Sequence, residues 1–502
     1  MFDTLTLLGN GFAVALQPTN LFFAFVGVLL GQIIGALPGI GPSLGMVLLL
    51  PVSFGLQPVT AIIMLSGIMY GAMYGGTLTS VLINVPGESS SVMTTTEGYP
   101  LARQGRGGVA LSIAAIGSFI AGIASLFALI FAALAISTFA LRFQPPEYFL
   151  LALLGISMSA NLGEGSVTKA LAMAAFGLLL ALVGTDPITG AERLTFGRQE
   201  LLDGIDFIPV AIGVFGIAEV LITLERTMDL APMKMRLREM WPTWNDWLET
   251  RWAILRGSVF GFLLGVLPGV GPTTATFLTY AIEKRFSPHP EKFGKGALDA
   301  LAACESANNS AVSGALVPML TLGIPSSGLT AVLLAAFTLH NIRPGPLLMT
   351  EQPELVWGLI ASMFIGNVML LVLNLPLAPL FASLLRIPYA YLAPGILVLA
   401  LIGAYASNLQ MFTVVVALVF GMLGYFMIKA DLPRSPLILA LVLAPIMEQS
   451  LRQSLIISQG SLSIFVDRPV SAVLLVALAM TLAWPVWQAV WQTVRTRGRR
   501  TA

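Results

Sequence analysis

The chain has 502 residues, of which 56% are hydrophobic and only 10% are charged, and its mean hydropathy is +0.87. Soluble domains carry about 25% charged residues, so this composition excludes an ordinary soluble protein. The net charge of +1 disfavours a nucleic-acid partner. A single cysteine excludes an intramolecular disulfide, and two histidines leave little for a metal site built from histidine and cysteine.

Long apolar stretches predict an all-α polytopic membrane protein. Residues 4–87 contain no charged side chain and no histidine, and residues 355–385 and 470–493 are also uncharged. Each stretch exceeds the ~20 residues that a membrane-spanning helix needs, and the lack of apolar–polar alternation disfavours a β-barrel. The shortest segments are expected to be half-helices or re-entrant hairpins. The apolar segments in chain order are 20–37, 43–56, 59–85, 108–141, 148–160, 167–184, 207–224, 252–267, 272–282, 297–322, 326–341, 355–385, 391–428, 435–446 and 470–493.

A polar interval in the middle of the chain predicts two transmembrane halves. We expect a first unit over residues 1–224, an amphipathic, basic connector over 225–251 and a second unit over 252–502. Tryptophan beside basic residues is typical of a segment that lies on the membrane surface, although a solvated loop would also be polar. The relevant side chains are Lys234, Arg236, Arg238, Trp241, Trp244, Trp247 and Trp252.

Other basic residues indicate the orientation of the chain. The positive-inside rule places the C-terminus in the cytoplasm, because Arg495, Arg497, Arg499 and Arg500 follow the last apolar segment. The N-terminus lacks the basic region of a secretory signal, so we expect its first apolar segment to be retained. A further group of basic residues is interpreted as charge on the cytoplasmic side of the membrane. Its arginines could instead bind a carboxylate, since arginine is a natural bidentate partner of that group. This group comprises Arg103, Arg106, Lys284, Arg285, Lys292 and Lys295.

One motif occurs twice, once in each half. Residues 31–42 and 261–272 share the pattern Gly-x3-Gly-x2-Pro-Gly-x-Gly-Pro, and the weaker pair 84–87 and 323–326 follows in the same order. Helix breakers survive at membrane depth only where the backbone is buried in protein or lines a cavity. Paired broken helices are a pointer to a transporter's binding site, so the sequence predicts two structural repeats, inverted by analogy with other transporters.

Broken helices offer binding groups of both signs. The carbonyls at the end of one half-helix suit a cation, and the N–H groups that begin the next suit a carboxylate, which nearby hydroxyls can also bind. A tight helix–helix contact that requires small residues is the alternative interpretation. The candidate substrate-binding residues are Gly39, Gly41, Ser43, Gly87, Ser89, Gly269, Gly271, Thr273, Thr274, Pro325, Ser326 and Ser327.

A carboxylate and two amides fall inside an apolar segment at residues 305–309. Such groups are costly in a membrane unless they are paired or functional. We therefore expect Glu305, Asn308 and Asn309, together with Asn84, to handle a coupling ion, either Na⁺ or H⁺. Hydrogen bonding between helices is the alternative role.

These motifs resemble the large membrane subunit of tripartite tricarboxylate transporters (TctA-type). The resemblance rests on the duplicated motif, on Glu305-Ser-Ala-Asn308-Asn309 and on Gly323-Ile-Pro325, and it covers essentially the whole chain. It implies a secondary importer of citrate and related carboxylates in the bacterial inner membrane, driven by a cation gradient. It also implies two protein partners, a small four-helix membrane subunit and a periplasmic solute-binding protein.

Three other functions compete with carboxylate import. A transporter of another small organic anion, such as a sulfonate or an aromatic acid, would share the same features. An intramembrane enzyme would need a catalytic constellation, yet the sequence contains neither a paired-aspartate protease pattern nor a zinc-binding His-Glu-x-x-His. A passive channel is less compatible with broken helices in both halves. We therefore expect no catalytic residue, no cofactor and no resident metal. Because the sequence contains no P-loop, the energy for transport is expected to come from a gradient or from an external ATPase.

Overall fold

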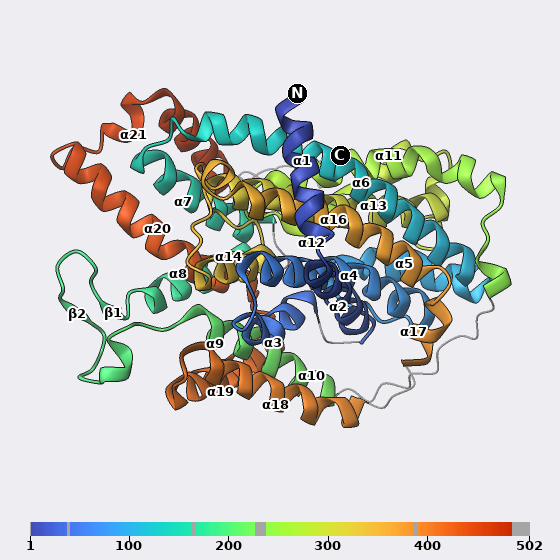
Figure 1. The fold of residues 1–502 in the computed structure, drawn as a ribbon, viewed down its shortest axis with the longest axis horizontal. Helices are drawn as coiled ribbons and strands as arrows, with labels where there is room; N and C mark the ends of the chain where they lie inside the picture. The colour runs from blue at the N-terminus through green and yellow to red at the C-terminus, as the bar shows by residue number, and fades with distance from the viewer. Residues whose placement is uncertain (1, 38–40, 163–165, 226–236, 385–388, 484–502) are drawn as a thin grey trace, which may run out of the picture.

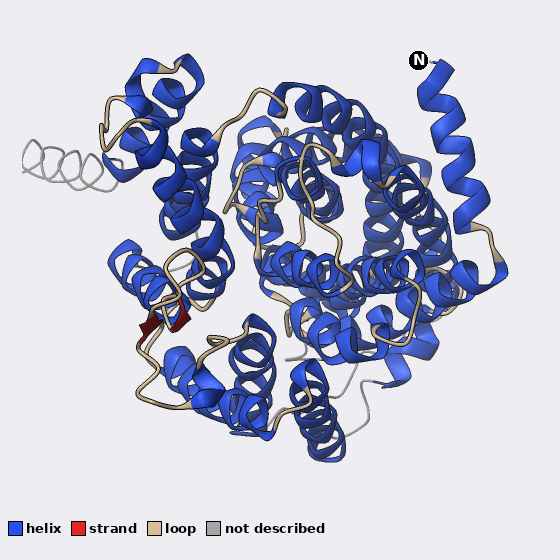
Figure 2. Cartoon of the chain, turned by 60° about the vertical axis from the view of Figure 1, so that its left-hand side comes forward, coloured by secondary structure: helices blue, strands red, loops and turns tan. Residues whose placement is uncertain are grey.

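A computed structural model of the chain describes residues 2–37, 41–162, 166–225, 237–384 and 389–483. Helices make up most of this part of the chain, and its one sheet is a two-stranded ribbon (Figure 2). The α-helices are α1 (Phe2–Ala15), α2 (Pro18–Ala36), α3 (Pro42–Ser53), α4 (Pro58–Ile83), α5 (Val92–Arg103), α6 (Gly107–Ala140), α7 (Pro145–Leu162), α8 (Val167–Ala181), α9 (Phe207–Ala211), α10 (Ala218–Glu225), α11 (Trp244–Val266), α12 (Gly271–Phe286), α13 (Leu298–Leu322), α14 (Gly328–Leu339), α15 (Leu348–Glu351), α16 (Pro353–Asn374), α17 (Ala378–Leu384), α18 (Tyr389–Asn408), α19 (Met411–Lys429), α20 (Ser435–Ile457) and α21 (Ile464–Asp467). The remaining elements are the 3₁₀ helices η1 (Ser89–Ser91), η2 (Gln199–Leu201), η4 (Leu237–Met240) and η5 (Pro290–Lys292), the π-helix η3 (Ile212–Ile217), and the strands β1 (Gly184–Thr185) and β2 (Glu192–Arg193).

The prediction of an all-α polytopic membrane protein is confirmed. Within the described residues, seven helices are long and apolar enough to cross a membrane. By contrast, α3 and α14 have 12 residues each, which span about 18 Å at 1.5 Å per residue and fall short of the ~30 Å hydrocarbon core. The spans are Pro18–Ala36, Pro58–Ile83, Gly107–Ala140, Phe207–Glu225, Pro353–Asn374, Tyr391–Asn408 and Met411–Lys429.

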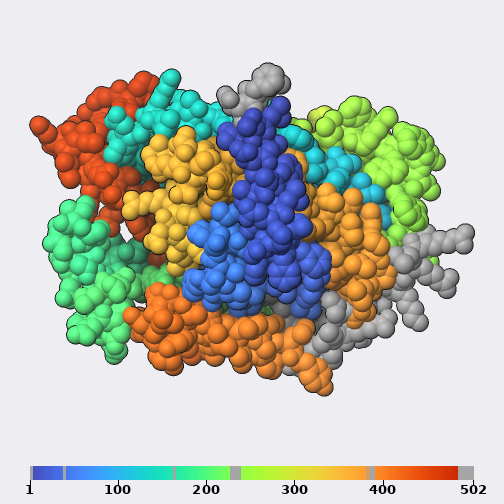
Figure 3. All heavy atoms as spheres, viewed as in Figure 1, coloured from blue at the N-terminus to red at the C-terminus, as the bar shows by residue number. Residues whose placement is uncertain are grey.

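Two expected segments are each divided in the structure. The apolar stretch 391–428 forms α18 and α19, which separate at Leu409, a residue with a left-handed backbone (φ 55°). These two helices pack against each other at one edge of the molecule, orange at the bottom of Figure 3. They expose large apolar side chains there, including Ile402 and Val419, as expected of a lipid-facing surface. The stretch 355–385 likewise forms α16 and α17.

Part of the expected connector is a helix continuous with the second half. Helix α11 runs from Trp244 to Val266 without a break at residues 251–252, because a capping box between Thr243 and Asp246 starts it eight residues earlier. Trp241 and Trp244 are largely exposed, as expected of a surface-lying segment. Residues 226–236, with Lys234 and Arg236, and residues 484–502, with the four C-terminal arginines, lie outside the described residues.

The core of the protein is built around two closely packed helix pairs, α2 with α4 and α11 with α13. In each pair, the upstream glycines of the duplicated motif face the backbone of the partner helix, where a Cβ atom would clash with a carbonyl oxygen. These glycines therefore serve close helix packing, as small residues do in membrane proteins. The contacts pair Gly31 with Ile68, Gly35 with Ala72, Gly261 with Ala307, and Gly265 with Ala311.

Outside the helical core, the β1–β2 ribbon is held to α20 by a charged contact. Asp186 accepts hydrogen bonds from Arg452 at 3.1 and 2.7 Å, and also from the backbone N–H groups of Ile188 and Thr189. The Arg452 guanidinium is the main cause that holds the pKa of Asp186 well below its usual range. The contact therefore stabilises the ribbon above the ordinary aspartate pKa of about 4 and loses that contribution as the pH falls toward the depressed value.

We expect Asp186→Asn to loosen the ribbon at neutral pH. The amide removes the charge that Arg452 binds, so protease cleavage between residues 184 and 193 should be faster than in the parent protein. Asp203→Asn is the matched control, because Asp203 is exposed in the same region and should leave cleavage unchanged. Equal cleavage of the Asp186 variant and the parent would show that the ion pair does not hold the ribbon.

Candidate functional site

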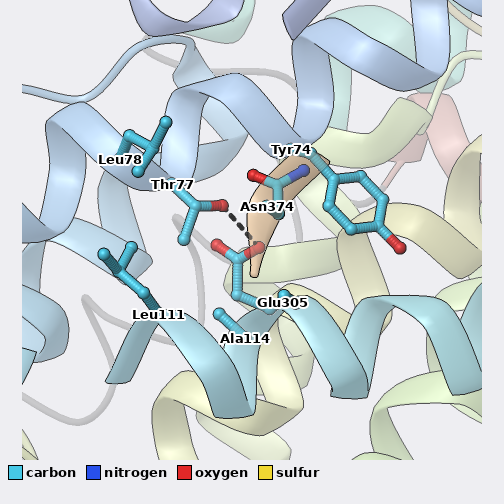
Figure 4. Close-up of a pocket in the computed structure, with 8 residues that line it drawn as sticks. Tyr74, Thr77, Leu78, Leu111, Ala114, Glu305 and Asn374 are labelled. Carbon is cyan, nitrogen blue, oxygen red and sulfur yellow. Dashed lines mark hydrogen bonds between the residues drawn. The ribbon is translucent and has the colours of Figure 1, made fainter. Parts of the chain in front are cut away.

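A carboxylate lies in the interior of the protein, on helix α13. Glu305 is 1% exposed, and both of its carboxylate oxygens accept hydrogen bonds from threonine hydroxyls. Thr77 of α4 donates to Oε2 at 2.8 Å (Figure 4), and Thr94 of α5 donates to Oε1. None of the ion pairs among the described residues includes Glu305. A buried carboxylate without a cationic partner is costly unless it takes up a proton or a cation, so this position is suited to binding one.

A small cavity adjoins this carboxylate (Figure 4). It has room for about one water molecule. The cavity can therefore take a single water molecule or a small ion, but not an organic substrate. It is lined by Tyr74, Thr77, Leu78, Leu111, Ala114, Ala115, Glu305 and Asn374.

Asn308 and Asn309 lie on the same helix as Glu305, and Asn308 also contacts a second carboxylate, that of Glu88. Asn308 donates to Oε1 of Glu88 at 3.2 Å, and Ser90 donates to the same oxygen at 2.5 Å. Asn309 donates to the backbone carbonyl of Glu305 at 3.3 Å. The side-chain oxygens of Asn308 and Asn309 are buried and accept no hydrogen bond from any described residue, so both remain available as oxygen ligands of the kind that hard cations use.

Asn84 is not brought to this cluster. It ends α4, seven residues after Thr77, and is exposed with a left-handed backbone (φ 57°). Gly323 ends α13 in the same way (φ 71°). Because asparagine is one of the few residues besides glycine that adopts this conformation readily, the backbone accounts for Asn84 without an ion.

Two helix N-termini from different halves of the chain meet in the structure. Helix α3 begins after Gly41, and helix α14 begins after its N-cap residue Ser327. The two helices are in contact, and Oγ of Ser43 lies 3.8 Å from the position that a Cβ atom would occupy on Gly328. The space beside Gly41 is open to the described part of the chain, none of which lies within 4 Å of the corresponding position. Paired N-termini with accessible hydroxyls suit a carboxylate.

The turn before α14 carries a buried hydroxyl with no described partner. The backbone N–H groups of Ser326 and Ser327 donate to Oγ1 of Thr330 at 2.9 and 3.0 Å. The hydroxyl of Ser326 is buried, as is Pro325, and it makes no hydrogen bond to any described residue. A ligand that approaches this turn would therefore find a free donor.

The second copy of the duplicated motif reaches the same turn. Gly269 and Gly271 have left-handed backbones (φ 79° and 65°), which favour glycine. A Cβ atom on Gly271 would lie 3.1 Å from Cβ of Ser327. Thr273 and Thr274 lie in the first turn of α12 and are half-buried.

The remaining candidates are placed differently. Gly87 is packed between α2 and α4, where a Cβ atom would lie 2.6 Å from the carbonyl oxygen of Gly35 and 2.5 Å from Cα of Gly76. Ser89 is exposed at the start of η1, and Gly39 lies outside the described residues. The structure thus gathers Gly41, Ser43, Gly271, Ser326 and Ser327 near one another, whereas Gly87 has a packing role.

The sequence analysis did not connect several residues of the carboxylate cluster with Glu305. Thr77 and Thr94 are ordinary polar residues of apolar or hydroxyl-rich stretches, and only tertiary packing brings them to Glu305. Glu88 did leave a local signal, because it follows Pro86-Gly87 in a segment rich in serine and threonine.

The fold and the cluster define a class of protein. This is a multi-pass α-helical membrane protein in which interrupted helices and interior polar groups meet, as in secondary transporters. The family model described as "Tripartite tricarboxylate transporter TctA family" matches residues 21–439. The chain belongs to this family, whose members are large membrane subunits of tripartite transporters.

Two similar proteins come from Agrobacterium vitis. One, described as "Uncharacterized 52.8 kDa protein in TAR-I ttuC' 3'region", is 47% identical over 475 residues and covers 95% of each chain. The other, "Uncharacterized protein in TAR-II ttuC' 3'region", is 47% identical over 215 residues, which are 43% of this chain and 89% of that protein. No solved structure matches the chain.

Proposed function

We propose that the protein imports citrate-like di- and tricarboxylates across the bacterial inner membrane, with uptake coupled to a cation gradient. Membership of the tricarboxylate transporter family supports the substrate class. The observation that carries the coupling is Glu305, a carboxylate buried on α13 that is bound by hydroxyl donors and by no basic side chain among the described residues. Such a group can pick up a cation on one side of a membrane and release it on the other.

The substrate and the coupling ion occupy separate places in this proposal. The cavity beside Glu305 is large enough for one water molecule or ion, whereas the N-termini of α3 and α14 provide N–H groups and hydroxyls for carboxylates. Asn308 and Asn309 offer side-chain oxygens next to Glu305. A coupling ion that is either Na⁺ or H⁺ is compatible with this arrangement. A transporter of another small organic anion would use the same N-termini.

The proposal includes the two other components of a tripartite system and an orientation. A small four-helix membrane subunit would accompany this chain, and a periplasmic solute-binding protein would deliver the substrate to the outward face. The C-terminus would lie in the cytoplasm. The transport role leaves no catalytic step for this chain, so an intramembrane enzyme or a passive channel would contradict the proposal.

We expect uptake to require the solute-binding protein. An anion present at low concentration is captured by a high-affinity receptor and reaches the transporter only as a complex. This chain and its small subunit are reconstituted into vesicles, and citrate uptake is measured with and without the binding protein under the same ion gradient. Uptake should be seen only with the binding protein, and equal uptake in both cases would refute receptor dependence.

A further inference from the structure

Arg434 lies near the N-termini of α3 and α14, and it was not among the candidate residues chosen from the sequence. Arg434 immediately precedes α20, and its Nη1 donates to Oε2 of Glu219 at 2.8 Å and to the carbonyl oxygen of Val214 at 3.2 Å. Its guanidinium lies 5.6 Å from the ring centroid of Phe215. All three partners belong to the candidate membrane span Phe207–Glu225, which is formed by α9, η3 and α10.

The ion pair between Arg434 and Glu219 is partly exposed on one side. Phe215 and Glu219 are the two half-buried residues between Ile208 and Val220, where all the others are buried. The side chains of Glu219 and Arg434 are each 24% exposed. Lipid is a poor neighbour for an ion pair, so the open side faces water or a polar ligand.

The guanidinium also has unused donors. Only Nη1 is engaged in the hydrogen bonds to Glu219 and Val214, and neither Nε nor Nη2 of Arg434 binds a described residue. The edge formed by Nε and Nη2 is one that arginine uses for a bidentate contact with a carboxylate. Two aligned donors on a half-buried arginine are thus available to an anion.

Phe215 links this arginine to the helix N-termini. The tip of its ring lies 3.3 Å from the position of a Cβ atom on Gly328, the first residue of α14, and Ser43 of α3 lies 3.8 Å from the same position. Helix α3 is also in contact with η3 and with α9, which lies beside it in Figure 1. One phenyl ring therefore separates Arg434 from the N-termini of two half-helices.

We propose that Arg434 recognises one carboxylate of the transported anion through its Nε–Nη2 edge, while the N-termini of α3 and α14 hold another part of the same molecule. Glu219 and the ring of Phe215 orient the guanidinium, and the charge of Glu219 limits its affinity for anions. This inference rests on the proposed function and makes Arg434 a determinant of specificity for polycarboxylates.

The test measures the affinity for citrate and for succinate by calorimetry, on the complete chain with its small membrane subunit in lipid nanodiscs. Arg434→Gln removes the recognising edge and should weaken citrate binding about 10- to 100-fold, as expected for the loss of a charged hydrogen-bonding partner. Arg434→Lys keeps the charge but not the fork, so its loss should be smaller. Glu219→Gln keeps an acceptor for Arg434 but removes the negative charge, and should strengthen citrate binding.

Opposite changes of citrate affinity in the Arg434 and Glu219 variants distinguish substrate recognition from a purely structural role. If the ion pair only held α20 to α10, the Arg434 and Glu219 variants would change stability in the same direction and leave affinity alone, which would overturn the inference. Arg468→Lys alters another half-buried ion pair, with Glu147, and should leave affinity unchanged. If Arg434→Gln does not fold, the citrate affinities of Arg434→Lys and Glu219→Gln test the inference instead. A parent protein that binds neither acid contradicts the proposed function itself, and this inference with it.

Discussion

Glu305→Gln should abolish the dependence of citrate uptake on the cation gradient while leaving the protein folded. Glutamine has the same shape, and the hydroxyls of Thr77 and Thr94 that now donate to the carboxylate can donate to its carbonyl oxygen or accept from its amide. The charge is lost, however, and with it the ability to bind and release a proton or Na⁺. The measurement is the initial rate of uptake in vesicles against the size of an imposed Na⁺ or proton gradient.

Two comparisons accompany the Glu305 variant. Asn308→Ala and Asn309→Ala should raise the cation concentration needed for half-maximal uptake, because each removes a side-chain oxygen that is free in the structure. Glu97→Gln is the matched control, since Glu97 is also buried but is fully engaged by Tyr280 and by three backbone N–H groups. A folded Glu305→Gln protein with unchanged ion dependence would reduce the cluster to hydrogen bonding between helices.

Alanine substitutions in the motif should separate strain from substrate contact. At Gly269 the backbone has φ 79°, and an added methyl group would lie 2.5 Å from the backbone nitrogen of Ser159 and closer still to the carbonyl oxygen of Gly155. Gly269→Ala should therefore destabilise the protein by at least the ~1–3 kcal/mol of a strained backbone. A lowered thermal unfolding temperature, measured in the same detergent as the parent, checks this expectation.

Gly41→Ala provides the complementary case. Gly41 has φ −67°, and no residue that the structure describes lies within 4 Å of its Cβ position, so alanine should fit with little strain. If a carboxylate approaches the N-terminus of α3, the methyl group should nevertheless lower citrate affinity in a protein of parental stability. Ser43→Ala and Thr273→Ala remove only a hydroxyl and should have milder effects, near the ~1 kcal/mol of a lost cap. Parental affinity in a folded Gly41→Ala protein would place the substrate elsewhere.

The duplicated motif illustrates what sequence reasoning can and cannot resolve. Its prolines and glycines predicted interrupted helices correctly, because these effects are local to the backbone. Ligand binding and close helix packing were both open interpretations of these glycines, and the structure distinguishes them by their neighbours. Gly35 packs against α4, whereas no described residue lies within 4 Å of the Cβ position on Gly41. Such neighbours depend on tertiary packing, and no local pattern encodes them.

The charged groups show the same limit. Glu305 could be predicted because a carboxylate within an apolar stretch is costly wherever the chain folds. Arg434 could not be predicted, because its partner Glu219 lies 215 residues away in the sequence and no local sequence pattern marks the π-helix that presents Phe215. Asn84 was selected for its side chain, although the structure accounts for it by its backbone conformation.

Cation-coupled import is tested most directly by the accumulation of citrate in vesicles that contain this chain, its small subunit and the binding protein. An inward Na⁺ or proton gradient is imposed, and internal citrate is compared with the external concentration before and after an ionophore dissipates the gradient. We expect citrate to rise above the external concentration only while the gradient lasts, and to do so in the parent but not in Glu305→Gln. Citrate that equilibrates to the same level with and without the gradient would contradict cation-coupled transport.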